Sequence, residues 1–208
     1  MIRNLVILSK GNFPSSAKTL ETLDEADCII CCDGAVESLL SYGRKPDLIT
    51  GDMDSLPAAL QERFRSIIRK NPDQETNDLT KAFRLALTLS PERITILGAT
   101  GAREDHTMGN VSLLMDYVRE ASCPVCILSD YGRFEAVHDS ASFPCRPGQE
   151  ISIFAFDNTL EIKSAGLKYP TDNVVFDSLW KATLNVAEAS SFSLTLSHPA
   201  GVLVYFAV

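Results

Sequence analysis

The sequence predicts an α/β protein in which a mostly parallel sheet with helices on both faces is followed by a small antiparallel β-sandwich. Over residues 1–132, short apolar runs alternate with stretches of helical periodicity, which is the order found in parallel sheets. Over residues 133–208 the helical periodicity stops, and strand-like runs are separated by Gly, Pro, Asn and Ser. We therefore divide the chain into an α/β domain, residues 1–132, and a β-sandwich domain, residues 133–208.

The apolar runs of the first domain are short and continuous, as expected for strands that are covered on both faces. They lie at residues 5–8, 28–32, 48–50, 67–69, 94–97 and 125–128. Helical stretches separate them near residues 17–23, 35–41, 57–64, 78–89 and 105–119. The last of these helices carries an apolar stripe at helical spacing, formed by Val111, Leu114, Met115 and Val118.

In the second domain, strands are predicted at residues 150–156, 160–162, 191–197 and 202–208. The third of these strands is the clearest, because Phe192, Leu194 and Leu196 alternate with serine and threonine. Such alternation is typical of a strand with one buried face and one exposed face. Two sheets of this kind, packed face to face, would form the sandwich.

Composition narrows the class of protein. Hydrophobic residues make up 45% of the chain, which is enough for a packed core, and the net charge of -8 disfavours a nucleic-acid partner. No apolar run approaches the ~20 residues of a membrane span, and the apolar start is too short for a secretory signal. We expect a cytoplasmic protein with reduced cysteines. The Cys123 and Cys126 pair is assigned to a buried strand, because its spacing matches no common zinc site.

Polar clusters follow several predicted strands, at the edge where open α/β sheets bind ligands. In Asp33-Gly34, the glycine permits close approach of a ligand, and the helix start that follows presents free N–H groups. The alternative is a turn with Asp33 as helix cap.

Asp52 and Asp54 point the same way in extended backbone and repel each other unless they share a cation. Mg²⁺ suits them, and a solvated acidic turn is the alternative.

A third cluster, residues 73–78, leads into the predicted helix at residues 78–89. Thr76 is the expected cap of that helix, and Asp78 would favour its positive end. Capping alone is a sufficient explanation for these residues. A metal role requires Asp78 to meet Asp52 and Asp54 across the sheet edge.

The fourth cluster is a glycine-containing loop between a strand and a helix, with an arginine inside it. Loops of this kind hold phosphates through backbone N–H groups and a guanidinium fork. The lysine and hydroxyl of a Walker A loop are absent. For His106, which lies in the same cluster, the alternative is a buried side chain with satisfied hydrogen bonds. The residues that we assign to this phosphate site are Thr100, Gly101, Arg103, Asp105, His106 and Asn110.

Taken in order, these clusters resemble the thiamine pyrophosphokinase family. Each motif alone is unspecific, but the ordered set runs along nearly the whole chain and is specific. The motifs are Asp33-Gly34-Ala35, Gly51-Asp52-Met53-Asp54-Ser55, Asp73-Gln74 with Asn77-Asp78, and Gly101-Ala102-Arg103-Glu104-Asp105-His106. Weaker support comes from Gly166-Leu167-Lys168-Tyr169 and Ser197-His198-Pro199.

The resemblance implies a nucleotide-binding α/β domain followed by a thiamine-binding and dimerisation sandwich, working as a homodimer. It implies Mg²⁺ on Asp52, Asp54 and Asp78, and ATP contacts that include Asp33 and Gly34. It also implies a thiamine site shared between subunits, with Gln74 reaching the pyrimidine. The chain departs from the family in three places: Gly101-Ala102 replaces a glycine pair, Asn77 replaces a commoner threonine, and Leu184-Asn185 replaces a Ser-Asn pair.

For the thiamine ring, we expect Trp180 to stack on the thiazolium and Asn185 to give a polar contact. The alternative for Trp180 is a place in the core or at a dimer interface.

The implied reaction transfers pyrophosphate from ATP to the thiamine hydroxyl, giving thiamine diphosphate and AMP. Mg²⁺ and Arg103 would stabilise phosphate charge, and Asp78 or Asp52 would accept the hydroxyl proton. Two other functions remain open. One is a different metal-dependent nucleotide phosphotransferase or hydrolase, and the other is a non-catalytic protein that binds thiamine or a nucleotide.

Overall fold

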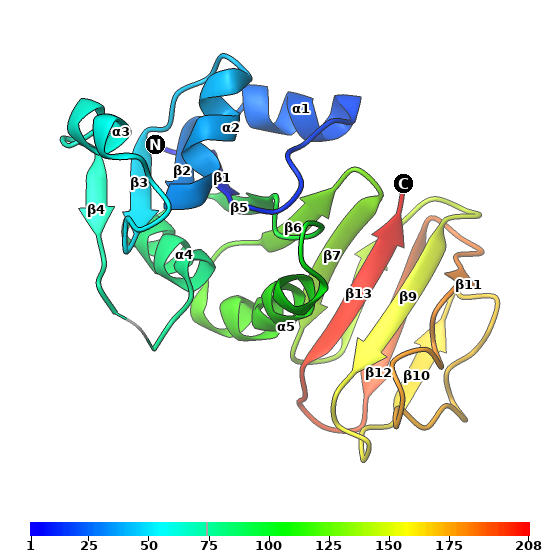
Figure 1. Cartoon of the computed structure of the whole chain (residues 1–208). Helices are drawn as coiled ribbons and strands as arrows, with labels where there is room; N and C mark the ends of the chain where they lie inside the picture. Colours follow the sequence, from blue (N-terminus) through cyan, green and yellow to red (C-terminus); the bar gives the residue numbers. More distant parts are fainter. Residues whose placement is uncertain (74) are drawn as a thin grey trace. The chain divides into compact units, whose positions relative to one another are not determined.

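The computed structural model describes residues 1–73 and 75–208, so the predicted thiamine contact Gln74 lies outside the described residues. The chain forms two compact units, and Figure 1 shows its ribbon coloured along the sequence. The first unit comprises Met1–Leu113 and Ala121–Asp130. The second comprises Leu114–Glu120 and Tyr131–Val208.

The first unit holds a parallel sheet, as predicted. Its strands are β1 (Asn4–Leu8), β2 (Cys28–Cys32), β3 (Leu48–Gly51), β4 (Ile68–Lys70), β5 (Arg93–Leu97) and β6 (Val125–Ser129). They lie in the order β4-β3-β2-β1-β5-β6, and each neighbouring pair is parallel. The order reverses between β1 and β5, which is where sheets of this type bind ligands at the carboxyl ends of their strands.

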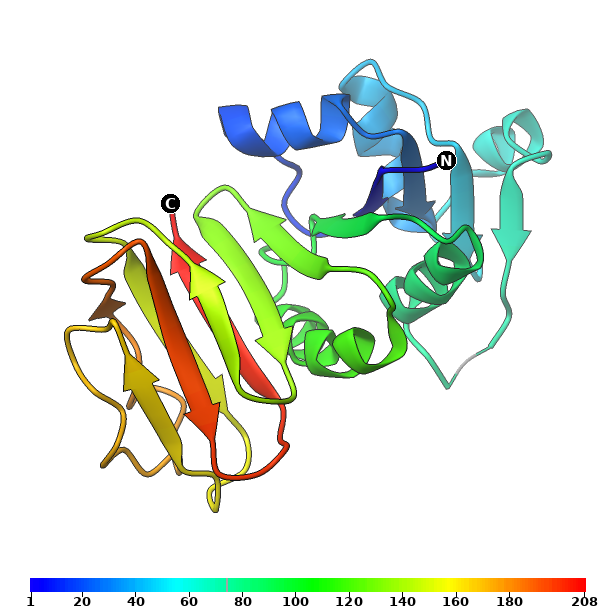
Figure 2. The ribbon, with the colours of Figure 1, turned by 180° about the vertical axis from the view of Figure 1, so that it is seen from behind.

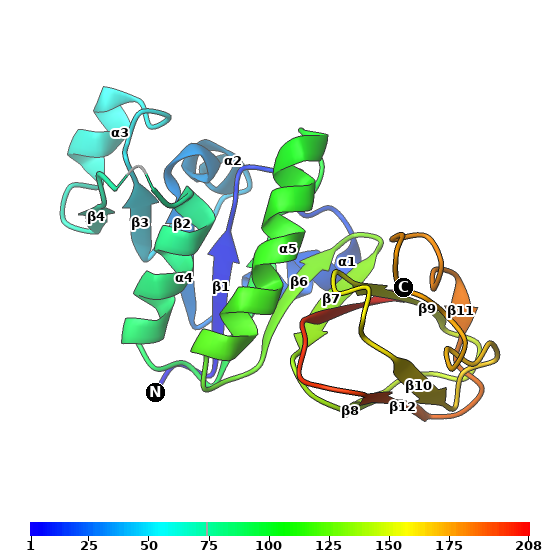
Figure 3. The same ribbon diagram turned by 90° about the horizontal axis from the view of Figure 1, so that it is seen from below.

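Helices cover both faces of this sheet. They are α1 (Ala17–Asp24), α2 (Val36–Ser41), α3 (Ala58–Arg63), α4 (Asp78–Thr88) and α5 (Glu104–Glu120), with a 3-10 turn, η1 (Asp33–Ala35), before α2. Figure 3 shows α4 and α5 over one face, and α1 and α2 over the other. Every residue of β2 is buried, because a strand in this position has no face toward solvent.

One local prediction in the first unit was wrong. Asn77, and not Thr76, caps α4, because its side-chain oxygen accepts the backbone N–H of Thr80 at 2.9 Å. In α5, Leu114 of the predicted apolar stripe is buried, Val111, Met115 and Val118 are partly buried, and Tyr117 is buried beside them. A tyrosine buries most of its ring and keeps a polar tip, which a count of aliphatic residues overlooks.

The second unit is an antiparallel sandwich, which confirms the predicted fold class (Figure 2). Its strands are β7 (Gly132–Val137), β8 (Ala141–Pro144), β9 (Glu150–Ala155), β10 (Ile162–Ala165), β11 (Asn185–Val186), β12 (Ser191–Leu196) and β13 (Val202–Ala207). One layer runs β11-β9-β13-β7 and the other β10-β12-β8, with antiparallel pairs throughout. The strand predicted at residues 160–162 in fact begins at Ile162, and β7, β8 and β11 were not predicted.

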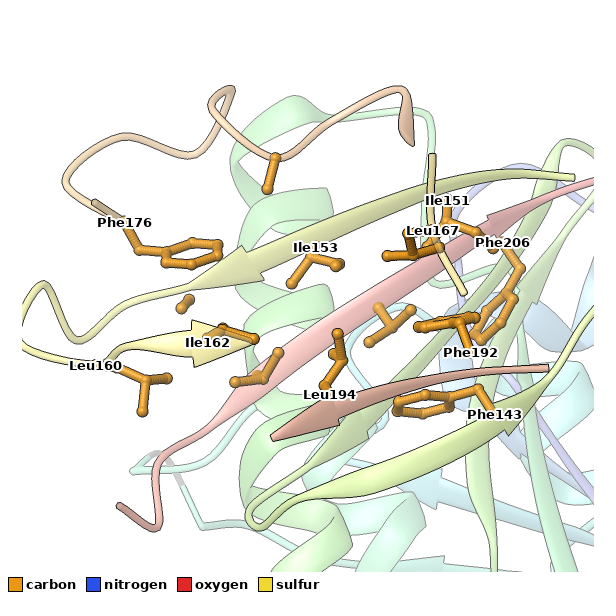
Figure 4. Close-up of a cluster of buried hydrophobic side chains, with 14 of the residues drawn as sticks. Phe143, Ile151, Ile153, Leu160, Ile162, Leu167, Phe176, Phe192, Leu194 and Phe206 are labelled. Carbon is orange, nitrogen blue, oxygen red and sulfur yellow. The ribbon is translucent and has the colours of Figure 1, made fainter. Parts of the chain in front are cut away.

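The core of the sandwich is aromatic as well as aliphatic. Phe143 and Phe192 stack with ring centroids 5.0 Å apart, and Phe206 packs against both rings (Figure 4). All three rings are nearly inaccessible to solvent. Burial of such side chains accounts for the packing of one layer on the other. Among the described residues, no helix is long and apolar enough to cross a membrane.

Candidate active site

A pocket of about 550 Å³ lies at the carboxyl edge of the parallel sheet, within the first unit. The loops that follow β1, β2, β3, β4 and β5 all contribute to its lining. Among the described lining residues there are five carboxylates, Asp33, Asp52, Asp54, Asp73 and Asp78, and three cations, Lys10, Lys81 and Arg103. The excess of negative charge suits a bound cation.

Three of these carboxylates form a tight group. Oxygen atoms of Asp33, Asp52 and Asp54 lie within 4.8 Å of one another. Asp33 is held in place by two backbone N–H groups, from Gly34 to Oδ1 at 2.6 Å and from Met53 to Oδ2 at 2.9 Å. The N–H of Asp54 donates to Oδ1 of Asp52 at 3.0 Å. Hard oxygen donors at this spacing fit Mg²⁺.

The backbone of the β3 loop is shaped around Asp33. Gly51 has a φ of 147°, and a Cβ atom there would lie 2.8 Å from Cγ of Asp33. Met53 adopts a left-handed φ of 74° although it is not a glycine. Left-handed backbone costs a non-glycine residue on the order of 1–3 kcal/mol, so the rest of the fold must hold this loop in place.

The electrostatics of the three carboxylates, Asp33, Asp52 and Asp54, favour a bound cation. Burial raises the pKa of Asp33, and the negative charges of Asp78 and Asp52 raise it further, whereas the N–H groups of Gly34 and Met53 lower it. The carboxylates therefore repel one another. A divalent cation placed between them would remove that repulsion.

Asp78 lies in the first turn of α4 and lines the same pocket. It forms an ion pair with Lys81, whose Nζ lies 3.1 Å from Oδ1 of Asp78 and whose side chain is only 4% exposed. The tight group of carboxylates contains Asp33 and does not contain Asp78. Asp33 was predicted only as a nucleotide contact, so the structure adds it to the candidates for the metal. The predicted set of Asp52, Asp54 and Asp78 stays a prediction.

The loop after β5 brings its arginine to the pocket. Gly101 and Ala102 both have left-handed φ angles, 76° and 60°, which turn the chain sharply before α5. Arg103 forms a fork with Asp105, from Nε to Oδ1 at 3.1 Å and from Nη2 to Oδ2 at 2.5 Å. This arginine lowers the pKa of Asp105 to about 2, with help from the N–H of His106.

The residues predicted to contact the nucleotide, other than Asp33, divide into two groups. Gly101, Arg103, His106 and Asn110 line the pocket, whereas Gly34, Thr100 and Asp105 do not. The side-chain amide of Asn110 donates to the carbonyl of Ala99 at 2.9 Å, so it supports the loop.

The thiamine candidates of the second unit differ in environment. Trp180 is 71% exposed, so its ring is open to a ligand or partner. Asn185 is buried, and its side-chain amide bonds the backbone of Tyr169, donating to the carbonyl at 2.7 Å and accepting the N–H at 3.1 Å. The side chain of Asn185 is thus engaged in holding the sandwich loop.

Sequence reasoning missed two charged residues of the described pocket lining, Lys10 and Lys81. Lys81 lies three residues after Asp78, and that helical spacing was a usable signal. Asp73 accepts hydrogen bonds from the N–H of Glu75 and the hydroxyl of Thr76, so it organises its own loop. Lys10 contacts residues that are distant in the sequence, and no local pattern marks it.

Comparison with known proteins decides the family. The model of the thiamin pyrophosphokinase catalytic domain matches residues 19–127, and that of the thiamin pyrophosphokinase substrate-binding domain matches residues 132–205. The chain belongs to the thiamin pyrophosphokinase family. The pocket described above is formed largely by the part of the chain that matches the catalytic domain.

Individual thiamine pyrophosphokinases agree with this result. The protein from Bacillus subtilis (strain 168) is 30% identical over 168 residues, which cover 72% of this chain and 73% of that one. Thiamine pyrophosphokinase 1 from Oryza sativa subsp. japonica is 35% identical over 96 residues, 41% of this chain and 35% of the relative. The chain thus spans about a third of that relative, and 44% of thiamin pyrophosphokinase 1 from Caenorhabditis elegans.

Solved structures of the family share the fold. The crystal structure of thiamine pyrophosphokinase from Bacillus subtilis superposes with a TM-score of 0.77 at 21% identity, covering 98% of this chain and 99% of that one. Thiamin pyrophosphokinase from Candida albicans gives a TM-score of 0.79 at 17% identity, covering 99% and 89%. At these identities the likeness is one of fold.

Proposed function

We propose that the chain is a Mg²⁺-dependent thiamine pyrophosphokinase, which transfers the diphosphate group of ATP to the hydroxyl of thiamine. The observation that supports this most is an acidic pocket at the carboxyl edge of the sheet, in the region that matches the family's catalytic domain. Ligands of open α/β sheets bind at such edges. The products would be thiamine diphosphate and AMP.

In the proposed reaction, the thiamine hydroxyl attacks the β-phosphorus of ATP, an O–P bond forms, and the bond from that phosphorus to the AMP oxygen breaks. The barrier is set by alignment and charge, so the protein's task is to position the two substrates. When bound, Mg²⁺ neutralises phosphate charge. We assign its binding to Asp52 and Asp54, with Asp33 or Asp78 completing the set.

Other side chains of the pocket have distinct proposed tasks. Arg103 presents a planar fork to the polyphosphate, and it would exchange part of its contact with Asp105 for phosphate oxygens. Lys81 fixes the carboxylate of Asp78 through their ion pair. Either Asp52 or Asp78 accepts the proton of the thiamine hydroxyl.

For thiamine, we propose contacts from Gln74 and from the exposed ring of Trp180. An aromatic face attracts a cation such as the thiazolium by about 0.5–2 kcal/mol. We assign Asn185 a supporting role, because its amide already holds the backbone of Tyr169. We further propose a homodimer in which the sandwich of one subunit completes the thiamine site of its partner, and a cytoplasmic location, which the free cysteines suit.

The test is an assay of the purified protein with ATP and Mg²⁺, with and without thiamine, in which every nucleotide product is quantified. We expect thiamine diphosphate and AMP to form only when all three are present. Release of ADP or AMP without thiamine would identify another nucleotide phosphotransferase or hydrolase instead. Binding of thiamine or ATP with no turnover would identify a binding protein.

A further inference from the structure

We infer that Lys10, in the loop after β1, is a phosphate-binding residue whose ammonium group contacts the polyphosphate of a bound nucleoside triphosphate. The inference rests on the proposed function and adds a substrate contact to the same pocket. It was not indicated by the sequence motifs, because Lys10 belongs to none of them. Four features of the structure support it: a fixed backbone, an anchored loop, a side chain with defined contacts, and a charge that has no carboxylate partner among the described residues.

The backbone on either side of Lys10 is fixed. The N–H of Ser9 donates to the carbonyl of Leu97 at 2.9 Å, and the N–H of Gly11 donates to the carbonyl of Gly98 at 2.6 Å. The loop after β1 is thereby joined to the loop after β5, which carries the proposed phosphate contacts. The starting point of the Lys10 side chain is therefore set by the sheet edge itself.

The far end of the same loop is anchored by Asp130. Its carboxylate accepts hydroxyl donors from Ser15 and Thr19, each at 2.6 Å, and the backbone N–H groups of Ser15 and Ser16. Partial burial raises the pKa of Asp130, but these hydrogen bonds outweigh it and hold the pKa well below its usual range. The loop that carries Lys10 is thus held at both ends without any ligand.

The side chain of Lys10 follows a defined course across the neighbouring loops. It passes directly over Gly34, where a Cβ atom would lie 2.3 Å from Cδ of Lys10 and 3.0 Å from Nζ. Its Nζ then donates to Oγ of Ser55 at 3.2 Å. Gly34 therefore makes room for the lysine, and the ammonium group reaches the loop that carries Asp52 and Asp54.

The charge of Lys10 is what distinguishes it from the other cations of the pocket. Lys81 pairs with Asp78, and Arg103 pairs with Asp105. Among the described residues lining the pocket, Lys10 is the cation that has no carboxylate oxygen within 4.0 Å. An ammonium group has three donors, and the contact with Ser55 uses one of them. Phosphate oxygens beside a metal-binding group of carboxylates are the natural acceptors for the others.

The experiment compares binding of two nucleotides by isothermal titration calorimetry: α,β-methylene-ATP with Mg²⁺, which cannot react, and AMP. The variants are Lys10→Met, Lys10→Arg and the matched control Lys18→Met, an exposed lysine on α1. We expect Lys10→Met to weaken binding of the triphosphate roughly 10- to 100-fold, because a hydrogen bond to a charged group is lost. Binding of AMP should change little, Lys10→Arg should retain most of the affinity, and Lys18→Met should behave as the unmodified protein.

Several outcomes would overturn the inference. One is unchanged binding of the triphosphate to Lys10→Met, and another is equal weakening for AMP and the triphosphate. Tighter Mg²⁺ binding in Lys10→Met with unchanged nucleotide affinity would show that the lysine only neutralises the carboxylates. The assay needs no thiamine: a protein that binds the triphosphate through Lys10 but makes no thiamine diphosphate would refute the proposed function and leave the inference standing.

Discussion

Both units of the molecule hold clusters of polar side chains, but the clusters differ in how their members are satisfied. In the sandwich, Nε2 of His198 lies 3.1 Å from Asp157, and Ser197 lies 3.0 Å from the other ring nitrogen. The hydroxyl of Thr159 and the ring of His198 lower the pKa of Asp157 to about 2. At the sheet edge, by contrast, Asp33 and its neighbours carry like charges that raise the pKa of Asp33 further than burial alone would.

The two clusters show how side chains that support the fold differ from side chains that bind a ligand. Polar groups of opposite character that satisfy one another, such as those around His198, stabilise a turn and need no ligand. Like charges held close by a strained loop, such as those around Asp33, become stable only when a cation or proton joins them. We therefore expect substitutions in the sandwich core to change stability, and substitutions at the sheet edge to change turnover.

The largest expected effect is on the sandwich core. Phe192→Ala should lower the free energy of unfolding by about 3–5 kcal/mol, because it removes a ring that is packed against two others. Chemical denaturation followed by circular dichroism measures the change. The control is Thr195→Ala, at an exposed position of the same strand, which should cost less than about 1 kcal/mol. Equal effects of the two changes would contradict the assignment of Phe192 to the core.

At the sheet edge, Asp54→Asn should lower Mg²⁺-dependent turnover at least about 100-fold, because charge stabilisation through a metal contributes several kcal/mol. The thermal unfolding midpoint should stay the same or rise, since a repelling charge is removed. Asp172→Asn, an exposed aspartate of the second unit, serves as control and should leave turnover unchanged. Full activity of the Asp54 variant would remove Asp54 from the metal site.

A finer test of the same edge is Arg103→Lys, which keeps the charge and loses the planar fork. We expect the KM for ATP to rise, or kcat to fall, by roughly 10-fold, while thiamine binding is less affected. Steady-state kinetics with each substrate varied in turn distinguish these effects. Arg65→Lys, at an exposed arginine of the first unit, is the control. Unchanged kinetics would mean that Arg103 is a surface cation paired with Asp105 and nothing more.

The smallest expected effect concerns the exposed aromatic ring of the second unit. Trp180→Ala should raise the KM for thiamine roughly 2- to 30-fold, as expected for loss of a cation–π contact of about 0.5–2 kcal/mol. The KM for ATP and the stability should not change, because the side chain is 71% exposed. Tyr131→Ala, at another exposed aromatic residue, is the comparison. If both variants keep the original KM, the sandwich offers thiamine no stacking contact through Trp180.

The sequence predicts those elements whose interactions are local, and it misses those that depend on contacts between distant parts of the chain. Strands β1, β2, β5 and β6 are continuous apolar runs, and their burial on both faces makes them recognisable locally. Strand β7 was missed because it carries Arg133 and Glu135, which look exposed in the sequence. In the structure they form an ion pair at 2.6 Å, and the guanidinium group lies 4.0 Å from the ring centroid of Phe206.

The site shows the same limit. Asp52 and Asp54 were identifiable because both lie in one short motif. Asp33 can approach the loop after β3 only because Gly51 has no side chain and Met53 adopts a strained backbone. Lys10 can reach across the loop after β2 only because Gly34 has no side chain. Each of these contacts joins loops that follow different strands, so only the folded sheet brings the residues together.

We propose that the sheet edge catalyses diphosphate transfer, and the fate of labelled phosphate distinguishes this reaction from other uses of ATP. The protein is incubated with Mg²⁺, thiamine and ATP carrying label in the γ-phosphate, and in parallel with ATP carrying label in the α-phosphate. We expect the γ label to appear in thiamine diphosphate and the α label in AMP, in equal amounts. Recovery of the γ label as inorganic phosphate, or of the α label in ADP, would contradict it.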